Sequence, residues 1–184
     1  MTSRPVNAGE RPRSRREAWA AGLGTVWQRL TVTQLEPLEQ QLRQPDVQHK
    51  ILTRAAELVA QGWTRGTAAR DAEGRKVPST ASEATAWCVV GAIDRALYEL
   101  VGVDVYQVLG FDVATYDTAP CPLPAVRALR REPERMLGRR DLARWNDTAC
   151  PDGATAEFVL RTAARMVAGR GEATGPTPPV RGPG

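Results

Sequence analysis

The sequence has few residues that ligate metals or act as nucleophiles, since its 184 residues include one histidine, His49, and three cysteines. Cys88, Cys121 and Cys150 are widely spaced, no Cys-x-x-Cys pair occurs, and the pattern matches no zinc site. An odd number of cysteines favours a reducing compartment, where a cysteine is usually a small buried apolar residue. We therefore expect no metal, no cofactor and a cytoplasmic location.

Long apolar runs and internal repeats are also missing. No stretch approaches the roughly 18 uninterrupted apolar residues of a membrane-spanning helix, and neither a repeat nor a sustained heptad is visible. These absences argue against a membrane protein, a solenoid and a coiled coil. Residues 14–27 superficially resemble a twin-arginine export signal, and that alternative stays open.

Positive charge is unevenly distributed along the chain, whose formal net charge is +4. Residues 1–17 hold five arginines and two glutamates, and residues 127–144 hold seven arginines and three acidic residues. The second stretch is the strongly basic part of the body, although we expect Pro133 and Gly138 to interrupt it. It favours contact with nucleic acid or an acidic protein surface, and a merely solvated face is the alternative. The candidate contact residues are Arg130, Arg131, Arg139 and Arg140.

Proline and glycine concentrate at the ends of the chain and divide it into four parts. We expect a basic disordered tail over 1–17, an uncertain lead-in over 18–33, a single helical domain over 34–169, and a disordered Pro/Gly-rich tail over 170–184. The length suits one hydrophobic core.

Apolar residues at helical spacing predict three principal helices, over 46–62, 82–101 and 155–168. We expect the last helix to bury Phe158 and Met166. Each segment starts at a residue suited to capping a helix and ends at a glycine. These starts and ends are Asp46 and Gly62, Ser82 and Gly102, and Thr155 and Gly169.

Weaker patterns predict shorter helices near 34–43, 124–131 and 139–145, whereas 103–113 fits a strand or a short helix equally well. Strand signals are otherwise sparse. The fold class that follows is all-α, a compact orthogonal helical bundle of three principal helices and several short ones.

Five short motifs occur in a characteristic order. They are Gly-Trp-x-x-Gly (62–66), Asp-x-x-Gly-Arg (71–75), Cys-x-x-Gly-Ala (88–92), Trp-Asn-Asp (145–147) and a closing amphipathic helix (154–166). Their order resembles a family of small actinobacterial and phage proteins, domain of unknown function 6197, over about 48–168. In that family the cysteine follows the Gly-Arg within a few residues, whereas KVPSTASEATAW separates the two motifs here. The resemblance implies a shared fold unit and no particular reaction.

The Trp-Asn-Asp motif permits two interpretations. Trp145 is suited to anchoring a helix in the core, with Asn146 and Asp147 closing that helix and opening the next turn. Alternatively, the three side chains form a ligand pocket in which the indole stacks and the polar groups bond to a small molecule.

Cys88 lies in the first turns of its predicted helix, where a helix dipole lowers the pKa of a thiol. A thiol-dependent enzyme would pair it with His49 as base and Asp147 as orienting residue. We favour packing instead, because Gly91 and Ala92 lie one turn further on and allow another helix to approach closely.

We therefore predict a non-enzymatic intracellular binding or accessory protein. Its partner would be nucleic acid or an acidic protein surface, bound through the Arg-rich tail or the 127–144 stretch. The alternatives are a small-molecule-binding protein and a thiol-dependent enzyme that uses Cys88. Nothing in the sequence indicates the oligomeric state.

Overall fold

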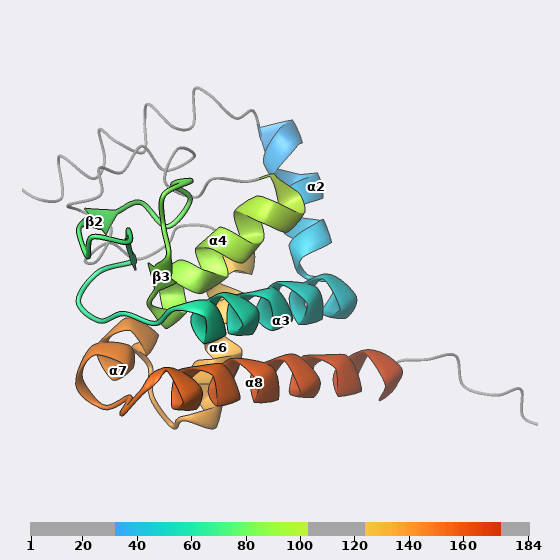
Figure 1. Cartoon of the computed structure of the whole chain (residues 1–184). Coiled ribbons are helices and arrows are strands. Elements are labelled where there is room, and N and C mark those ends of the chain that lie inside the picture. The colour runs from blue at the N-terminus through green and yellow to red at the C-terminus, as the bar shows by residue number, and fades with distance from the viewer. Residues whose placement is uncertain (1–31, 103–123, 174–184) are drawn as a thin grey trace, which may run out of the picture.

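A computed structural model describes residues 32–102 and 124–173, with side chains placed over 36–102 and 124–170. Within these ranges the protein is mostly helical and carries one small sheet (Figure 1). The elements are α2 (Val32–Leu42), α3 (Pro45–Gln61), β1 (Ala69–Arg70), β2 (Lys76–Val77), β3 (Ala86–Trp87), α4 (Val89–Val101), α6 (Pro124–Met136), α7 (Leu142–Thr148) and α8 (Gly153–Ala173). The expectation of a purely all-α fold is therefore wrong.

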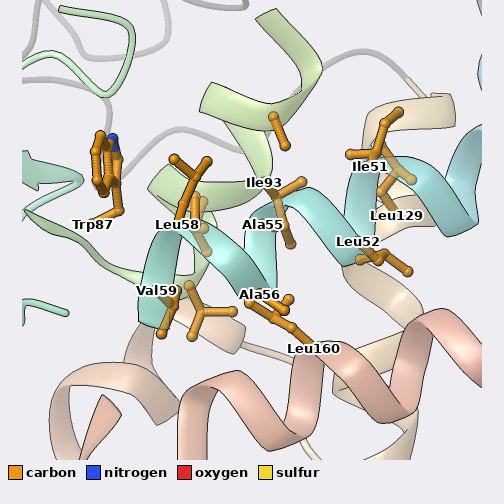
Figure 2. Close-up of a cluster of buried hydrophobic side chains, with 14 of the residues drawn as sticks. Ile51, Leu52, Ala55, Ala56, Leu58, Val59, Trp87, Ile93, Leu129 and Leu160 are labelled. Carbon is orange, nitrogen blue, oxygen red and sulfur yellow. The ribbon is translucent and has the colours of Figure 1, made fainter. Parts of the chain in front are cut away.

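Helix α3 is the centre of the core, with α4 packed on one side and α8 on the other (Figure 1). Its apolar residues recur at i, i+1, i+4 and i+5, which gives it a buried face wide enough for two neighbours. Figure 2 shows Ile93 of α4 and Leu160 of α8 on opposite sides of this helix. The residues that α3 buries are Ile51, Leu52, Ala55, Ala56, Leu58 and Val59.

The sheet has the order β2-β1-β3, and both pairs are antiparallel. Ala69 of β1 lies opposite Val77 of β2 and Trp87 of β3. The amide of Trp87 also donates to the carbonyl of Gly62 at 2.9 Å, which ties the sheet to the end of α3. Strands of two residues are too short to produce an alternating pattern, so the sequence carried no periodic signal for them.

Helix α4 starts seven residues later than predicted. Cys88, not Ser82, is its N-cap, and its thiol sulfur accepts the amide hydrogen of Gly91 at 3.2 Å. The residues before Cys88 belong to a loop and to β3, because pairing with β1 outweighs the helical propensity of an Ala-rich segment. The predicted end is confirmed, with Gly102 in the left-handed conformation at φ 73°.

The predicted end of α3 at Gly62 is confirmed, whereas the predicted N-cap at Asp46 is wrong. Gln44 is the N-cap and makes no side-chain capping bond, while Asp46 lies in the first turn. Gly62 follows the helix in extended backbone at φ −173°, a conformation open to any residue. It is a glycine for a different reason, since a Cβ there would lie 2.2 Å from the carbonyl oxygen of Thr85.

Helix α8 differs from its prediction at both ends and in its buried face. Asp152 caps it by accepting the amide of Thr155 at 2.8 Å, and the helix continues past Gly169 to Ala173. Phe158 and Met166 are 61% and 41% exposed, so their predicted burial is wrong. The buried face instead consists mainly of small residues, which let α8 approach α3 closely: Ala156, Val159, Leu160, Ala163, Ala164 and Val167.

The three shorter helices are present with shifted limits, as α2, α6 and α7. Helix α6 runs through Pro133, so the predicted interruption at that residue is wrong, while Gly138 follows the helix end as expected. Five predictions fall wholly or largely outside the described residues: the tails over 1–17 and 170–184, the lead-in over 18–33, the export-like segment over 14–27, and the ambiguous segment over 103–113.

The close approach at Gly91 yields a first prediction. A Cβ there would lie 2.0 Å from the backbone oxygen of Ala68, so Gly91→Ala forces α4 away from the loop before β1. We expect Gly91→Ala to lower the free energy of unfolding by about 3 kcal/mol, as overpacking does in a tight core. Urea denaturation measures this.

Gly169→Ala is the matched control, because nothing lies within 4 Å of the added methyl group in α8. Alanine is the better helix former, so this variant should gain up to about 1 kcal/mol. Equal stabilities for the two variants would contradict the close approach at Gly91.

Candidate functional site

Asn146 of α7 is fully buried and every hydrogen-bonding group of its side chain is used by the protein. Its Oδ1 accepts the indole N–H of Trp63 at 2.9 Å and the backbone N–H of Val89 at 3.1 Å. Its Nδ2 donates to the carbonyl of Thr64 at 3.1 Å and to Oδ1 of Asp147 at 2.9 Å. One amide therefore joins the segment after α3, the first residue of α4, and α7.

The residues around Asn146 complete the same junction. Asp147 Oδ1 also accepts the amide of Gly66 at 2.9 Å, where the chain turns at φ 69°. Trp63 is half-buried, and the guanidinium of Arg65 lies 4.7 Å from its ring centroid. The Arg65 guanidinium also donates to the carbonyls of Cys150 and Pro151. The contacts of the Trp-Asn-Asp motif therefore support the structural interpretation over a ligand pocket.

The Asp-x-x-Gly-Arg motif is a self-contained turn. The buried Asp71 carboxylate accepts the amides of Glu73 and Arg75 and the Nε–H of Arg75, the last at 2.6 Å. Gly74 occupies the positive φ of 77° that this turn requires. The turn joins β1 to β2 and positions the two strands against each other.

Cys88 is 6% exposed, and burial raises the pKa of its thiol to about 12. Gly91 in the same helix approaches the backbone of Ala68 closely, and not a second helix as predicted. The imidazole of His49 does not contact this thiol. Its Nδ1 instead lies 3.0 Å from the carbonyl oxygen of Ala164 on α8. His49 and Gly62 are separated by roughly 20 Å along α3, so the structure does not bring His49, Cys88 and Asp147 together.

A groove of about 670 Å³ opens at the other end of α3, between α6 and the second half of α8. Six of its twelve lining residues are arginines and none is aromatic. The lining residues are Arg43, Pro45, Gln48, Ala128, Arg131, Glu132, Glu134, Arg135, Arg139, Arg140, Val167 and Arg170. We call this surface the arginine groove.

Three of the four arginines selected from the sequence line this groove. Arg131, Arg139 and Arg140 form no ion pair within the described parts of the chain. Arg130 does not line the groove and bonds instead to Asp94, a fully buried carboxylate of α4, at 3.0 Å. Its charge is therefore used inside the protein, because a buried carboxylate without a partner is strongly destabilising.

The end of α6 places two of the groove's arginines. Gly138 adopts a φ of 61°, and the amide of Arg139 reaches back to the carbonyl of Glu134 at 2.9 Å. This is the Schellman arrangement, which turns the chain sharply after a helix. It holds Arg139 and Arg140 at the rim. Burial raises the pKa of the Glu134 carboxyl.

The described residues thus form a mostly helical domain with a polar junction at one end of α3 and an arginine groove at the other. The chain belongs to the family of unknown function DUF6197, which matches residues 43–166. This confirms the resemblance found from the order of the motifs. No curated protein and no solved structure matches the chain.

Among the described residues, no group of three or more histidine, cysteine or acidic side chains is arranged to hold a metal ion. No helix in the same ranges has the length and apolar character needed to cross a membrane.

Several groove residues were missed by the sequence analysis. Arg43 follows α2 and Arg170 lies near the end of α8, so neither neighbours the 127–144 stretch in sequence. Arg135 and Glu132 lie within that stretch, but nothing in its composition separates them from their neighbours. Folding alone brings these segments together.

The junction yields a second prediction. Asn146→Ala leaves the buried Trp63 N–H, Val89 N–H and Thr64 carbonyl without their partner. Because each orphaned buried group costs about 1–3 kcal/mol, we expect a loss of about 3–5 kcal/mol in unfolding free energy.

Asp147→Asn serves as control, since its amide oxygen can still accept from Gly66. That change should cost under about 1 kcal/mol. An Asn146→Ala variant with near-native stability and a lost ligand would restore the pocket interpretation.

Cys88 yields a third prediction. Iodoacetamide at neutral pH should label it only as fast as the protein unfolds, which peptide mapping over time measures. The folded pKa lies above the unfolded value of about 9, so the buried thiol stabilises the fold below that pH and its contribution is lost as pH rises towards about 12. Rapid labelling of the native protein would contradict this account.

Proposed function

We propose that this chain is a non-enzymatic binding or accessory protein that holds an anionic partner, nucleic acid or an acidic protein surface, in the arginine groove. The observation that carries the proposal is the convergence of six arginines from separate segments on one concave surface. A solvated basic face would place its arginines on a convex surface, where nothing requires them to converge.

Charge balance in the groove supports an anionic occupant. Six arginines and two glutamates line the groove; Glu132 is paired with Arg135 and Arg170, and Arg43 is paired with Glu39 outside the lining. Arg131, Arg139 and Arg140 have no such partner among the described residues. Concave surfaces of one sign focus the electrostatic field and attract ligands of the opposite charge.

The lining of the groove favours contact with a charged backbone over contact with bases. Proteins that grip single strands stack the bases on aromatic side chains, and the groove has none. Its apolar lining residues are Pro45, Ala128 and Val167, which offer little stacking surface. A partner that presents a regular row of anionic groups fits this surface best.

The proposal includes a cytoplasmic location and an actinobacterial or phage source. The location is supported by the two buried free cysteines, Cys88 and Cys150. The source is supported by the family resemblance.

The thiol-enzyme alternative loses support, because His49 lies at the groove end of α3 and Cys88 at the junction end.

A fourth prediction tests the proposal with the full chain and two fluorescent probes, a 20-base-pair DNA duplex of mixed sequence and a polyglutamate peptide. We expect at least one probe to bind, with an affinity that falls steeply between 50 and 200 mM salt. If five anionic groups of the duplex are neutralised, the decrease is roughly 500-fold. Fluorescence anisotropy measures both affinities.

The groove variant Arg131→Ala/Arg139→Ala/Arg140→Ala should bind the same probe at least tenfold more weakly and lower the salt slope by about three. The control is Arg127→Ala/Arg161→Ala/Arg165→Ala, which removes three exposed arginines that do not line the groove. We expect it to change affinity less than threefold. Failure of both probes to bind at 50 mM salt, or equal losses in the two variants, would overturn the proposal.

A further inference from the structure

Glu132 is a buried carboxylate at the wall of the arginine groove, with its side chain 7% exposed. Each of its two oxygens accepts from a different guanidinium. Oε1 contacts Nη2 of Arg135, on the same helix, at 2.5 Å, and Oε2 contacts Nη2 of Arg170, on α8, at 2.6 Å. One carboxylate thereby holds together two arginines that come from different helices.

Both arginines keep most of their surface free. Their side chains are 59% and 50% exposed, although the carboxylate between them is buried. A guanidinium has five N–H donors. Arg135 and Arg170 each donate one of their five to Glu132. Arg135 and Arg170 both line the groove, and each keeps further N–H donors beyond its bond to Glu132.

We propose that Arg135 and Arg170, positioned by Glu132, form a clamp for one phosphate group of the groove's ligand. The pair carries two positive charges against one negative, so it retains a net attraction for an anion. Because the two guanidinium groups bond to the two oxygens of one carboxylate, they are neighbours, and the proposed clamp brings one tetrahedral anion into contact with both.

Phosphate fits this arrangement better than a carboxylate does. A carboxylate has two oxygens in one plane and a single charge, which suits one guanidinium fork. A phosphate group carries its oxygens in a tetrahedral arrangement, so it can serve two forks from two directions. The clamp thus selects among the anionic partners of the proposed function, on which this inference rests, and favours a phosphate-bearing one.

The effect of Glu132 as a positioning residue can be distinguished from the effect of its negative charge. If it acted only as a negative charge in the groove, removing that charge with Glu132→Gln would tighten the binding of any anion. As a positioning residue it holds the two arginines in place, so the same change should weaken phosphate binding. The direction of the effect therefore distinguishes the two roles.

The test uses the full chain and isothermal titration with two small anions at matched ionic strength, pyrophosphate and citrate. We expect pyrophosphate to bind at least tenfold more tightly than citrate. Arg135→Lys/Arg170→Lys keeps both charges but loses the forked donors, and it should abolish that preference. Glu132→Gln should weaken pyrophosphate binding at least threefold, with thermal unfolding monitored alongside because the residue is buried.

Two outcomes would overturn the clamp: equal affinity for pyrophosphate and citrate, or an unchanged preference in Arg135→Lys/Arg170→Lys. Should Glu132→Gln fail to fold, the lysine variant decides the matter, since it alters only exposed side chains. If the protein binds polyglutamate but not the duplex, the clamp is contradicted and the proposed function is supported. If it binds pyrophosphate selectively but neither macromolecule, the clamp is supported and the proposed function is contradicted.

Discussion

The side-chain amide of Asn146 is the interaction on which the rest of the fold depends. It accepts from Trp63 and Val89 and donates to Thr64 and Asp147, so three segments far apart in sequence meet at one buried group. Only an amide supplies two donors and a double acceptor in so small a volume. The Gly-Trp-x-x-Gly, Cys-x-x-Gly-Ala and Trp-Asn-Asp motifs all converge on this junction, which explains in physical terms why they occur together.

The three motifs that meet at Asn146 and the arginine groove lie at opposite ends of α3. The junction surrounds the residues that follow its last turn, whereas Pro45 and Gln48 of its first turn line the arginine groove. A helix of 17 residues spans about 25 Å, so the two regions do not share side chains. In Figure 1, α7 lies at one end of α3, and α2 and the end of α8 lie at the other. The three motifs at the junction therefore build the fold, and the arginine groove is a separate surface.

Features set by neighbouring residues could be predicted from the sequence, whereas features set by contacts between distant segments could not. Periodic apolar residues predicted the existence of all six described helices, and Gly102 was placed correctly because local backbone chemistry decides where α4 ends. The start of α4 and the two-residue strands escaped, since they depend on pairing between distant segments. The basic stretch correctly indicated Arg131, Arg139 and Arg140 as groove residues. It could not show that Arg130 pairs with Asp94 inside the protein, or that Arg43 and Arg170 also line the groove.

The central claim is that the junction is structural and the groove is where an anionic partner binds. An amide ¹H–¹⁵N map of the full chain, recorded during titration with the DNA duplex, tests both halves in one measurement. The account predicts shifts confined to the first turn of α3, to residues 128–140 and to the end of α8, with the amides of Gly66 and Val89 unmoved. Shifts centred on residues 145–147, with the groove silent, would contradict it.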